Sequence, residues 1–272
     1  VYRPRPRPGA AMKTVLITGA ASGLGWAMAQ QFYQRGDCVW LVDRDAEGLQ
    51  QCSAALGNER VHTVVADLAD TAAIDAVAQA ITASGRLDIL VNNAGITHRS
   101  LAGHTDPAVF KKVMAIDWQA PVSLSMALLP LLRRSRGSII NIGSMAGWMP
   151  VLGRAAYCSA KSALSQFFEV LRGEEQDNGV HVLMVYPAFV NTNIEQNALG
   201  ADGNAARHAR STLGGIGEPE PLAAAILQAA ERRKPHLFPH RGIWLASLLW
   251  RVAPTTFHRL MRRKFAVELE QH

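Results

Sequence analysis

The sequence predicts an α/β protein with one doubly wound parallel sheet and helices on both faces. Two observations support this prediction. Short apolar runs rich in β-branched residues alternate with helical stretches along all 272 residues, and no linker divides the chain into halves. A glycine-rich turn also joins the first apolar run to the first helical stretch. The expected strands cover residues 13–18, 38–43, 61–66, 87–92, 137–143 and 180–186, with a short last strand at 236–239.

The first strand breaks into a turn that contains Gly19, Gly23 and Gly25, and a helical pattern begins at Trp26. Glycines at such a junction let the backbone approach a pyrophosphate, whose charge is then held by free amides and the positive end of the helix. The three glycines have the spacing G-x-x-x-G-x-G, which differs from the general dinucleotide-binding fingerprint G-x-G-x-x-G. The alternative to a phosphate-binding turn is a turn with a purely structural role. The second strand ends in Asp43, a position from which a carboxylate can accept hydrogen bonds from an adenosine ribose.

The later strands also end in polar residues. Asp67 follows the third strand, an Asn-Asn-Ala-Gly segment begins at Asn92 at the end of the fourth, and Ser144 follows the fifth. In sheets of this kind, ligands bind in the loops at the carboxyl ends of the parallel strands. Helices are expected over residues 107–134 and 221–232, and the latter precedes the short last strand.

Tyr157 and Lys161 are four residues apart, so on a helix they share one face. A cation beside a tyrosine lowers the pKa of the phenol from about 10, and the phenol can then exchange a proton near neutral pH. Ser144 adds a hydroxyl that can hold a substrate oxygen. The Tyr-x-x-x-Lys spacing alone is common on helix surfaces and is weak evidence for a catalytic pair. The nucleotide-binding pattern upstream in the same chain makes that interpretation more specific.

Together these motifs resemble the short-chain dehydrogenase/reductase family in its compact, single-domain Rossmann-type form. The resemblance covers roughly residues 13–240 and includes a segment from Pro187 to Thr192 after the sixth strand. It implies hydride transfer between a nicotinamide and an alcohol or carbonyl carbon of a small-molecule substrate, with the cofactor supplying the chemistry. The alternative function is a catalytically weak sensor or scaffold that binds the dinucleotide.

The resemblance also implies roles for individual residues. Tyr157 transfers the proton, Ser144 donates a hydrogen bond to the same substrate oxygen, and Lys161 stabilises the phenolate and bonds the nicotinamide ribose. Asp67 and Leu68 lie against the adenine, while Val190 and Thr192 hold the carboxamide. The expected cofactor-binding residues are Gly19, Ser22, Gly23, Leu24, Gly25, Asp43, Arg44, Asp67, Leu68, Asn92, Ala94, Gly95, Tyr157, Lys161, Pro187, Val190 and Thr192.

Two residues depart from the family pattern. Asp117 stands where relatives usually have an asparagine that anchors a water chain to the lysine, and we count it with the catalytic residues. A carboxylate there can still hold such a water, and it favours the charged lysine. Ala188 replaces a glycine that often follows the proline, and its methyl group is expected to crowd the cofactor. Asp43 disfavours a 2′-phosphate, so NAD is expected over NADP, although Arg44 can bind a phosphate if the aspartate turns away.

The segment between residues 192 and 218 is weakly apolar and is expected to form a lid. Its His208 is interpreted as a solvated histidine, and Arg207 and Arg210 as solvent-facing charges with recognition of an acidic substrate group as the alternative. Relatives commonly pair through the helix with Tyr157 and the 107–134 segment, so a homo-dimer or homo-tetramer is expected.

The last 32 residues, 241–272, form what we call the tail, a basic amphipathic helical extension of the domain over residues 12–240. The favoured interpretation is a pair of helices that closes the substrate cleft or packs on a second subunit, and contact with an anionic membrane surface is the alternative. Both interpretations of the tail are compatible with an apolar substrate. If the tail borders the site, apolar contacts are expected from Trp244, Leu248, Trp250 and Phe257.

Composition and charge bear on domain size, metal binding, nucleic-acid binding and cellular location. With 49% hydrophobic residues, the chain can bury most of its apolar surface as one domain. Cys38, Cys52 and Cys158 lack the spacing of metal ligands, so no metal is expected. The net charge of +6 is concentrated in the two ends without a recognition motif, and nucleic acid is not expected. Residues 1–11 are interpreted as a flexible arm or a cloning remnant. The apolar run of a secretory signal is not found after them, so the expected compartment is the cytoplasm.

Overall fold

The computed structural model describes residues 11–187, 190–191, 194, 197–206 and 217–265. Several residues discussed above lie outside these ranges: most of the arm, Ala188, Thr192, Arg207, His208 and Arg210.

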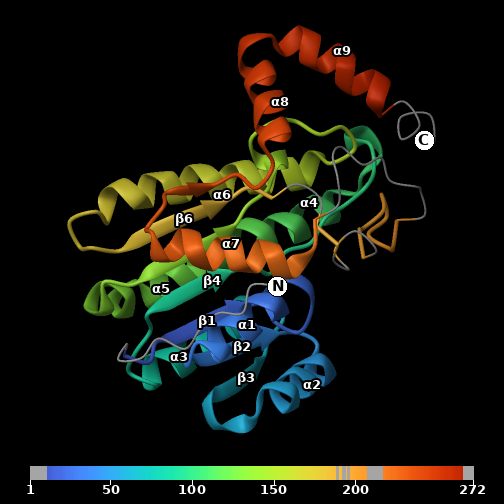
Figure 1. Cartoon of the computed structure of the whole chain (residues 1–272). Coiled ribbons are helices and arrows are strands. Elements are labelled where there is room, and N and C mark those ends of the chain that lie inside the picture. Colours follow the sequence, from blue (N-terminus) through green and yellow to red (C-terminus); the bar gives the residue numbers. More distant parts are fainter. Residues whose placement is uncertain (1–10, 188–189, 192–193, 195–196, 207–216, 266–272) are drawn as a thin grey trace.

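A seven-stranded parallel sheet forms the middle layer of the molecule (Figure 1). Its spatial order is β3-β2-β1-β4-β5-β6-β7, so the chain changes direction across the sheet between β1 and β4. Each strand agrees with its expected run to within two residues, and the predicted fold class is confirmed. The strands are Thr14–Thr18 (β1), Cys38–Asp43 (β2), Val61–Val65 (β3), Ile89–Asn92 (β4), Ser138–Ile142 (β5), His181–Val185 (β6) and His236–Leu237 (β7).

Two buried apolar clusters lie on opposite faces of the sheet. Val15 and Ile17 of β1 belong to one cluster and Leu16 to the other, because successive side chains of a strand point to opposite faces. The first cluster includes residues of α1 (Gly23–Gln34), α2 (Ala46–Leu56) and α7 (Pro219–Glu231). The second includes residues of α3 (Thr71–Ala83), α5 (Ala120–Ser135) and α6 (Ala155–Glu174).

The expected helix over residues 107–134 is not regular. It consists of α4 (Pro107–Met114), a π-helical segment η3 (Ala115–Gln119) and α5. Ala120 donates to the carbonyl of Ala115, five residues back. Pro121 has no N–H to donate to the carbonyl of Asp117, and a widened turn accommodates that loss.

The same stretch, Pro107–Ser135, is long and apolar enough to cross a membrane by length and composition. However, 56% of its most apolar segment is buried inside the protein, as in a core helix. The described residues up to 240 also form three short 3₁₀ helices: η1 (Asn58–Arg60), η2 (Ala102–His104) and η4 (Met145–Gly147).

The tail forms two helices, α8 (Arg241–Val252) and α9 (Pro254–Lys264), which project from one end of the molecule (Figure 1). Pro254 opens α9 at a position where its missing N–H is harmless. Phe257, Met261 and Phe265 follow at spacings of four and are buried, so they form the inner face of α9.

Candidate active site

A cavity of about 520 Å³ opens at the carboxyl ends of the central strands, where the strand order reverses. Its size is typical of small-molecule sites, and its place is where open α/β sheets bind ligands. The structure brings most of the predicted site residues to this cavity: Gly19, Ser22, Gly23, Leu24, Asp43, Arg44, Asp67, Leu68, Ala94, Gly95, Ser144, Tyr157, Lys161, Pro187 and Val190.

The glycine turn lies between β1 and α1. Gly19 and Gly23 have positive φ angles of 65° and 53°, which favour glycine. A Cβ at Gly25 would lie 2.1 Å from the carbonyl oxygen of Gly19, so this third glycine allows the close approach of turn and helix without lining the cavity itself.

The start of α1 is suited to an anion. The helix begins at Gly23 and not at the expected Trp26, and its N-cap residue Ser22 makes no side-chain hydrogen bond to the first turn. In contrast, aspartate side chains cap α2, α3 and α4, at Asp45, Asp70 and Asp106. No acidic residue lies in the first turn of α1 either. The free amides and the positive end of the helix dipole therefore face the cavity and fit the phosphates of a dinucleotide.

Asp43 is held at the end of β2 by two backbone amides. Its Oδ2 accepts from the N–H of Ala21 at 3.0 Å, and its Oδ1 accepts from the N–H of Asp45 at 3.1 Å. Both bonds would break if the carboxylate turned away. Arg44 lines the same part of the cavity.

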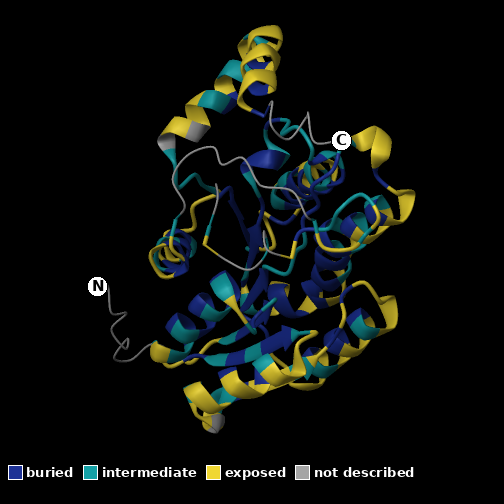
Figure 2. Ribbon diagram, turned by 90° about the vertical axis from the view of Figure 1, so that its right-hand side faces the viewer, coloured by how far each residue is buried: buried dark blue, intermediate teal, exposed yellow. Residues whose placement is uncertain are grey.

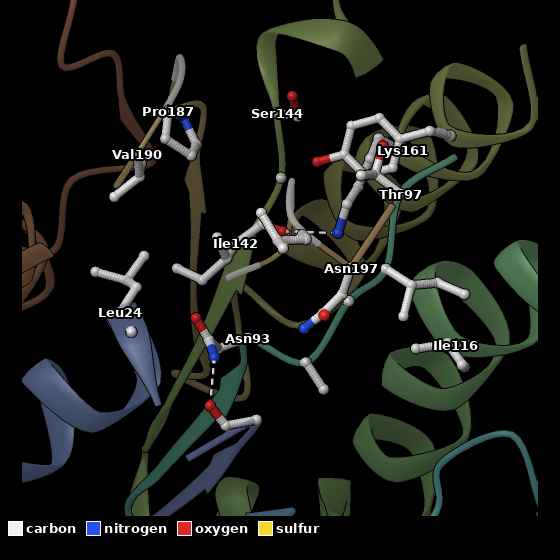
Figure 3. Close-up of a pocket in the computed structure, with 18 of the residues that line it drawn as sticks. Leu24, Asn93, Thr97, Ile116, Ile142, Ser144, Lys161, Pro187, Val190 and Asn197 are labelled. Carbon is white, nitrogen blue, oxygen red and sulfur yellow. Dashed lines mark hydrogen bonds between the residues drawn. The ribbon is translucent and has the colours of Figure 1, made fainter. Parts of the chain in front are cut away.

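Asn92 does not line the cavity, contrary to the expectation. Its side chain points into the core, where Nδ2 donates to Ser125 Oγ at 3.1 Å and to Asn141 Oδ1 at 2.8 Å, and so ties β4 to β5 and α5. The next residue, Asn93, lines the cavity instead. Its Nδ2 donates to the carbonyls of Thr18 and Gly19, at 2.9 and 3.1 Å, and so holds the glycine turn (Figure 3). The alternation of side chains along β4 was the signal that could have distinguished the two asparagines.

Ser144, in the loop after β5, and Tyr157 and Lys161, on α6, line the same cavity. The Oγ of Ser144 accepts from the N–H of Ala146 at 3.1 Å, which leaves its hydroxyl hydrogen available to a ligand. The ammonium of Lys161 lies 5.7 Å from the centroid of the Tyr157 ring and donates to the carbonyl of Ile142 at 3.1 Å (Figure 3).

Asp117 lies behind this group on the π-helical segment and is fully buried. Its Oδ2 is 3.2 Å from Lys161 Nζ, and its Oδ1 accepts from the N–H of Ile96 at 2.8 Å. Burial raises the pKa of Asp117, whereas the charge of Lys161 and the bond from Ile96 oppose that shift. The carboxylate thus contacts the lysine directly.

One wall of the cavity is largely apolar. Its side chains come from the loops after β4 and β5, from the segment around Leu199, and from the tail: Ile96, Met145, Met149, Val151, Leu199 and Phe265. Thr97 and Asn197 add polar groups to this wall (Figure 3). The hydroxyl of Thr97 is buried and has no hydrogen-bond partner among the described residues. Neither residue was identified from the sequence, which offers no motif for them.

The tail reaches the cavity through Phe265 and not through the four residues expected from the sequence. Phe257 is buried in the core cluster, and Trp250 packs against it with ring centroids 5.6 Å apart. Trp244 and Leu248 are on the exposed side of α8. Phe265 follows Phe257 by eight residues, about two helical turns, so it lies on the same inner face of α9. This position at the end of the helix brings Phe265 to the cavity.

The described part of the chain holds no group of three or more His, Cys, Asp or Glu side chains that could bind a metal ion. Burial raises the pKa of Cys158, and its thiol contacts the backbone of Val151.

A parallel doubly wound sheet with its cavity at the point where the strand order reverses, and a glycine turn beside it, defines a dinucleotide-binding protein of the Rossmann class. Within that class the chain belongs to the short-chain dehydrogenase family, whose model, described as short chain dehydrogenase, matches residues 13–202. The expected family membership is therefore confirmed, and the protein is an oxidoreductase of this family.

The relatives extend over nearly the whole chain. The sequence is 35% identical over 262 residues to dehydrogenase/reductase SDR family member 7B of Bos taurus, covering 91% of this chain and 79% of that protein. A short-chain dehydrogenase from Streptomyces avermitilis has 30% identity and a TM-score of 0.79, covering 94% of this chain and 98% of that one. One from Sphingobium yanoikuyae in complex with NADPH also has 30% identity, with a TM-score of 0.77 and 92% and 95% coverage.

Proposed function

We propose that this protein transfers a hydride between a nicotinamide dinucleotide, NAD in preference to NADP, and the alcohol or carbonyl carbon of an apolar substrate. One observation carries the proposal: Ser144, Tyr157 and Lys161 line the same cavity as the glycine turn of β1. Proton-handling groups and a phosphate-binding turn are thereby brought within one ligand-sized space.

The residues of the chain supply the proton and the orientation, while a bound nicotinamide supplies or accepts the hydride. In reduction the phenol of Tyr157 gives its proton to the carbonyl oxygen, and in oxidation it takes the proton of the hydroxyl. Ser144 donates a hydrogen bond to the same oxygen and offsets its negative charge. The ammonium of Lys161 favours the phenolate form of Tyr157.

Asp117 is a positioning residue in this proposal. Lys161 Nζ has two partners from different segments of the chain, the carboxylate of Asp117 at 3.2 Å and the carbonyl of Ile142 at 3.1 Å. A lysine has four flexible side-chain bonds, and these two contacts restrict where its charge can lie.

The preference for NAD rests on Asp43. A carboxylate fixed by the amides of Ala21 and Asp45 repels a 2′-phosphate and is available to the ribose hydroxyls. The complex of the Sphingobium relative contains NADPH, which supports a nicotinamide dinucleotide in this cavity but not the choice between the two forms.

The substrate class follows from the apolar wall of the cavity. Met145, Met149 and Phe265 offer large apolar surfaces in the same cavity as Ser144. We infer an alcohol or ketone with a bulky apolar body.

Self-association and location are further parts of the proposal. We infer a homo-dimer or homo-tetramer that pairs through the outer faces of α5 and α6, where Met126 and Val170 are 38% and 50% exposed. Light scattering of the purified protein tests this inference. The cytoplasm remains the proposed compartment.

Turnover of a panel of apolar alcohols and ketones by wild type and by Tyr157→Phe tests the proposed function. Loss of the proton donor is expected to lower kcat/KM by about 10²–10⁴-fold. Tyr33→Phe on α1 is the matched control and is expected to retain activity. Full activity of Tyr157→Phe would refute the mechanism, and NADH binding without turnover in either protein would favour the sensor or scaffold.

A further inference from the structure

The outer face of α8 has a stripe of exposed apolar side chains. Trp244, Leu245, Leu248 and Val252 are 39%, 57%, 37% and 80% exposed. Spacings of three, four and seven residues place them on one side of the helix. Nine large apolar side chains are exposed in the described part of the chain, and five of them lie on α8 and α9, the fifth being Leu260. A continuous stripe of this kind marks an interaction site, whereas scattered exposed residues do not.

The inner faces of the two helices are already packed. The guanidinium of Arg251 lies over the Trp148 ring at 4.5 Å, and Trp250 contacts Phe257. Phe257, Met261 and Phe265 are at most 5% exposed. The helices are therefore docked on the domain through one side, and the stripe on the other side is a separate surface.

The tail is also strongly basic. Residues 241–265 include six Arg or Lys residues and no Asp or Glu. Four of the bases lie on the exposed sides of α9, at Arg259, Arg262, Arg263 and Lys264. A Trp-bearing apolar stripe beside a basic helix is the composition of segments that lie in the plane of an anionic bilayer surface.

The shape of the molecule allows a flat surface to reach both helices. In Figure 1, α8 and α9 project beyond the sheet and its covering helices. The turned view in Figure 2 shows that both projecting helices carry many exposed residues. The 12 residues of α8 are too few to span a bilayer, which needs about 20, so α8 would lie along the surface.

We propose that the outer face of α8 and α9 docks peripherally on an anionic lipid surface, with the apolar stripe entering the headgroup boundary and the bases contacting lipid phosphates. The charge decides against a second copy of this chain as the occupant. A two-fold symmetric contact places the same patch on both sides, and here it would bring two basic faces together. An anionic bilayer complements both the apolar and the basic part of the surface.

Flotation of the full chain with vesicles tests the proposal. We expect binding to mixed phosphatidylcholine and phosphatidylglycerol vesicles, weak binding to phosphatidylcholine alone, and loss of binding as salt rises. The double variant Leu245→Asp with Val252→Asp is expected to bind at least about tenfold more weakly. Arg262→Gln with Arg263→Gln is expected to lose about 25-fold, since each base near the surface contributes about fivefold.

A matched control places the same charges elsewhere. Met12 and Val65 are 55% and 58% exposed, before β1 and on β3, and the variant Met12→Asp with Val65→Asp is expected to bind vesicles as wild type does. Thermal unfolding checks that all variants are folded. Because flotation needs no turnover, its outcome is independent of the proposed enzymatic function.

Three outcomes would overturn the proposal. The first is no binding to the mixed vesicles, and the second is binding that Leu245→Asp with Val252→Asp leaves unchanged. The third is a concentration-dependent dimer that this variant dissociates while vesicle binding is absent, which would assign the stripe to a second copy of the chain.

Discussion

The replacement Asp43→Asn separates the charge of the carboxylate from its shape. The asparagine keeps the size of the side chain but has only one acceptor oxygen, so it keeps one of the two bonds from the amides of Ala21 and Asp45 and loses the other. Two like unit charges 4 Å apart repel by about 4 kcal/mol at an effective dielectric of 20 and by about 1 kcal/mol in bulk water. Asp43 is half-buried, and a value near the lower limit, about 1.4 kcal/mol, corresponds to a tenfold change in Kd.

We therefore expect Asp43→Asn to bind NADPH about tenfold more tightly than wild type does. It should bind NADH about fivefold more weakly, because hydrogen bonds from the ribose to a neutral amide are about 1 kcal/mol weaker than those to a carboxylate. The ratio of the two dissociation constants should thus change by about 50-fold. Fluorescence titrations of the purified protein with NADH and NADPH measure this ratio.

Asp70→Asn is the control, since Asp70 caps α3 outside the cavity and asparagine is an equally good cap. Its ratio should equal that of wild type. The reasoning is refuted if wild type binds NADPH at least as tightly as NADH, or if Asp43→Asn leaves the ratio within about twofold. A ratio that instead responds to Arg44→Ala would assign the choice of cofactor to that arginine.

Three further predictions concern the cavity, the fold and its response to acid. Phe265→Ala should raise KM for bulky apolar substrates while leaving NADH affinity unchanged in titrations. Gly25→Ala should lower Tm and NADH affinity because its Cβ meets the Gly19 carbonyl, whereas Gly173→Ala on α6 meets nothing within 4 Å and should be neutral or stabilising. Burial, aided by Arg154, lowers the pKa of His98 to about 4, so its contribution to stability is complete above the unfolded pKa of 6.5 and is lost as pH falls toward 4. His98→Leu should reduce the acid sensitivity of urea unfolding by about 2–3 kcal/mol between pH 7.5 and 4, and an unchanged pH dependence would contradict this.

The sheet could be predicted because its signals are local. Buried parallel strands read as continuous apolar runs, and polar residues such as Asp43 and Ser144 mark their carboxyl ends. The cavity lies at those ends, so most of its residues follow once the strands are placed. The proximity of Tyr157 and Lys161 could likewise be predicted from their helical spacing alone.

The remaining site residues depend on packing between distant segments. Phe265 reaches the cavity only because α9 folds back on the loop after β5, 120 residues earlier in the chain. Asn93 lines the cavity in place of Asn92 because the last residue of β4 points into the core. The direct contact of Asp117 with Lys161 depends on a π-helical turn, for which Pro121 is a signal that marks an irregularity but not its geometry.

That π-helical turn has a consequence for how the chain tolerates changes in length. A π-helical turn holds one residue more than an α-helical turn of similar rise. Deletion of one residue within 115–119 would narrow this turn, so a different side chain would face Lys161 and Pro121 would lose the widened turn that accommodates its missing N–H. The same five residues therefore set both the course of this core helix and the chemistry next to the lysine, and a deletion there would alter activity and stability together.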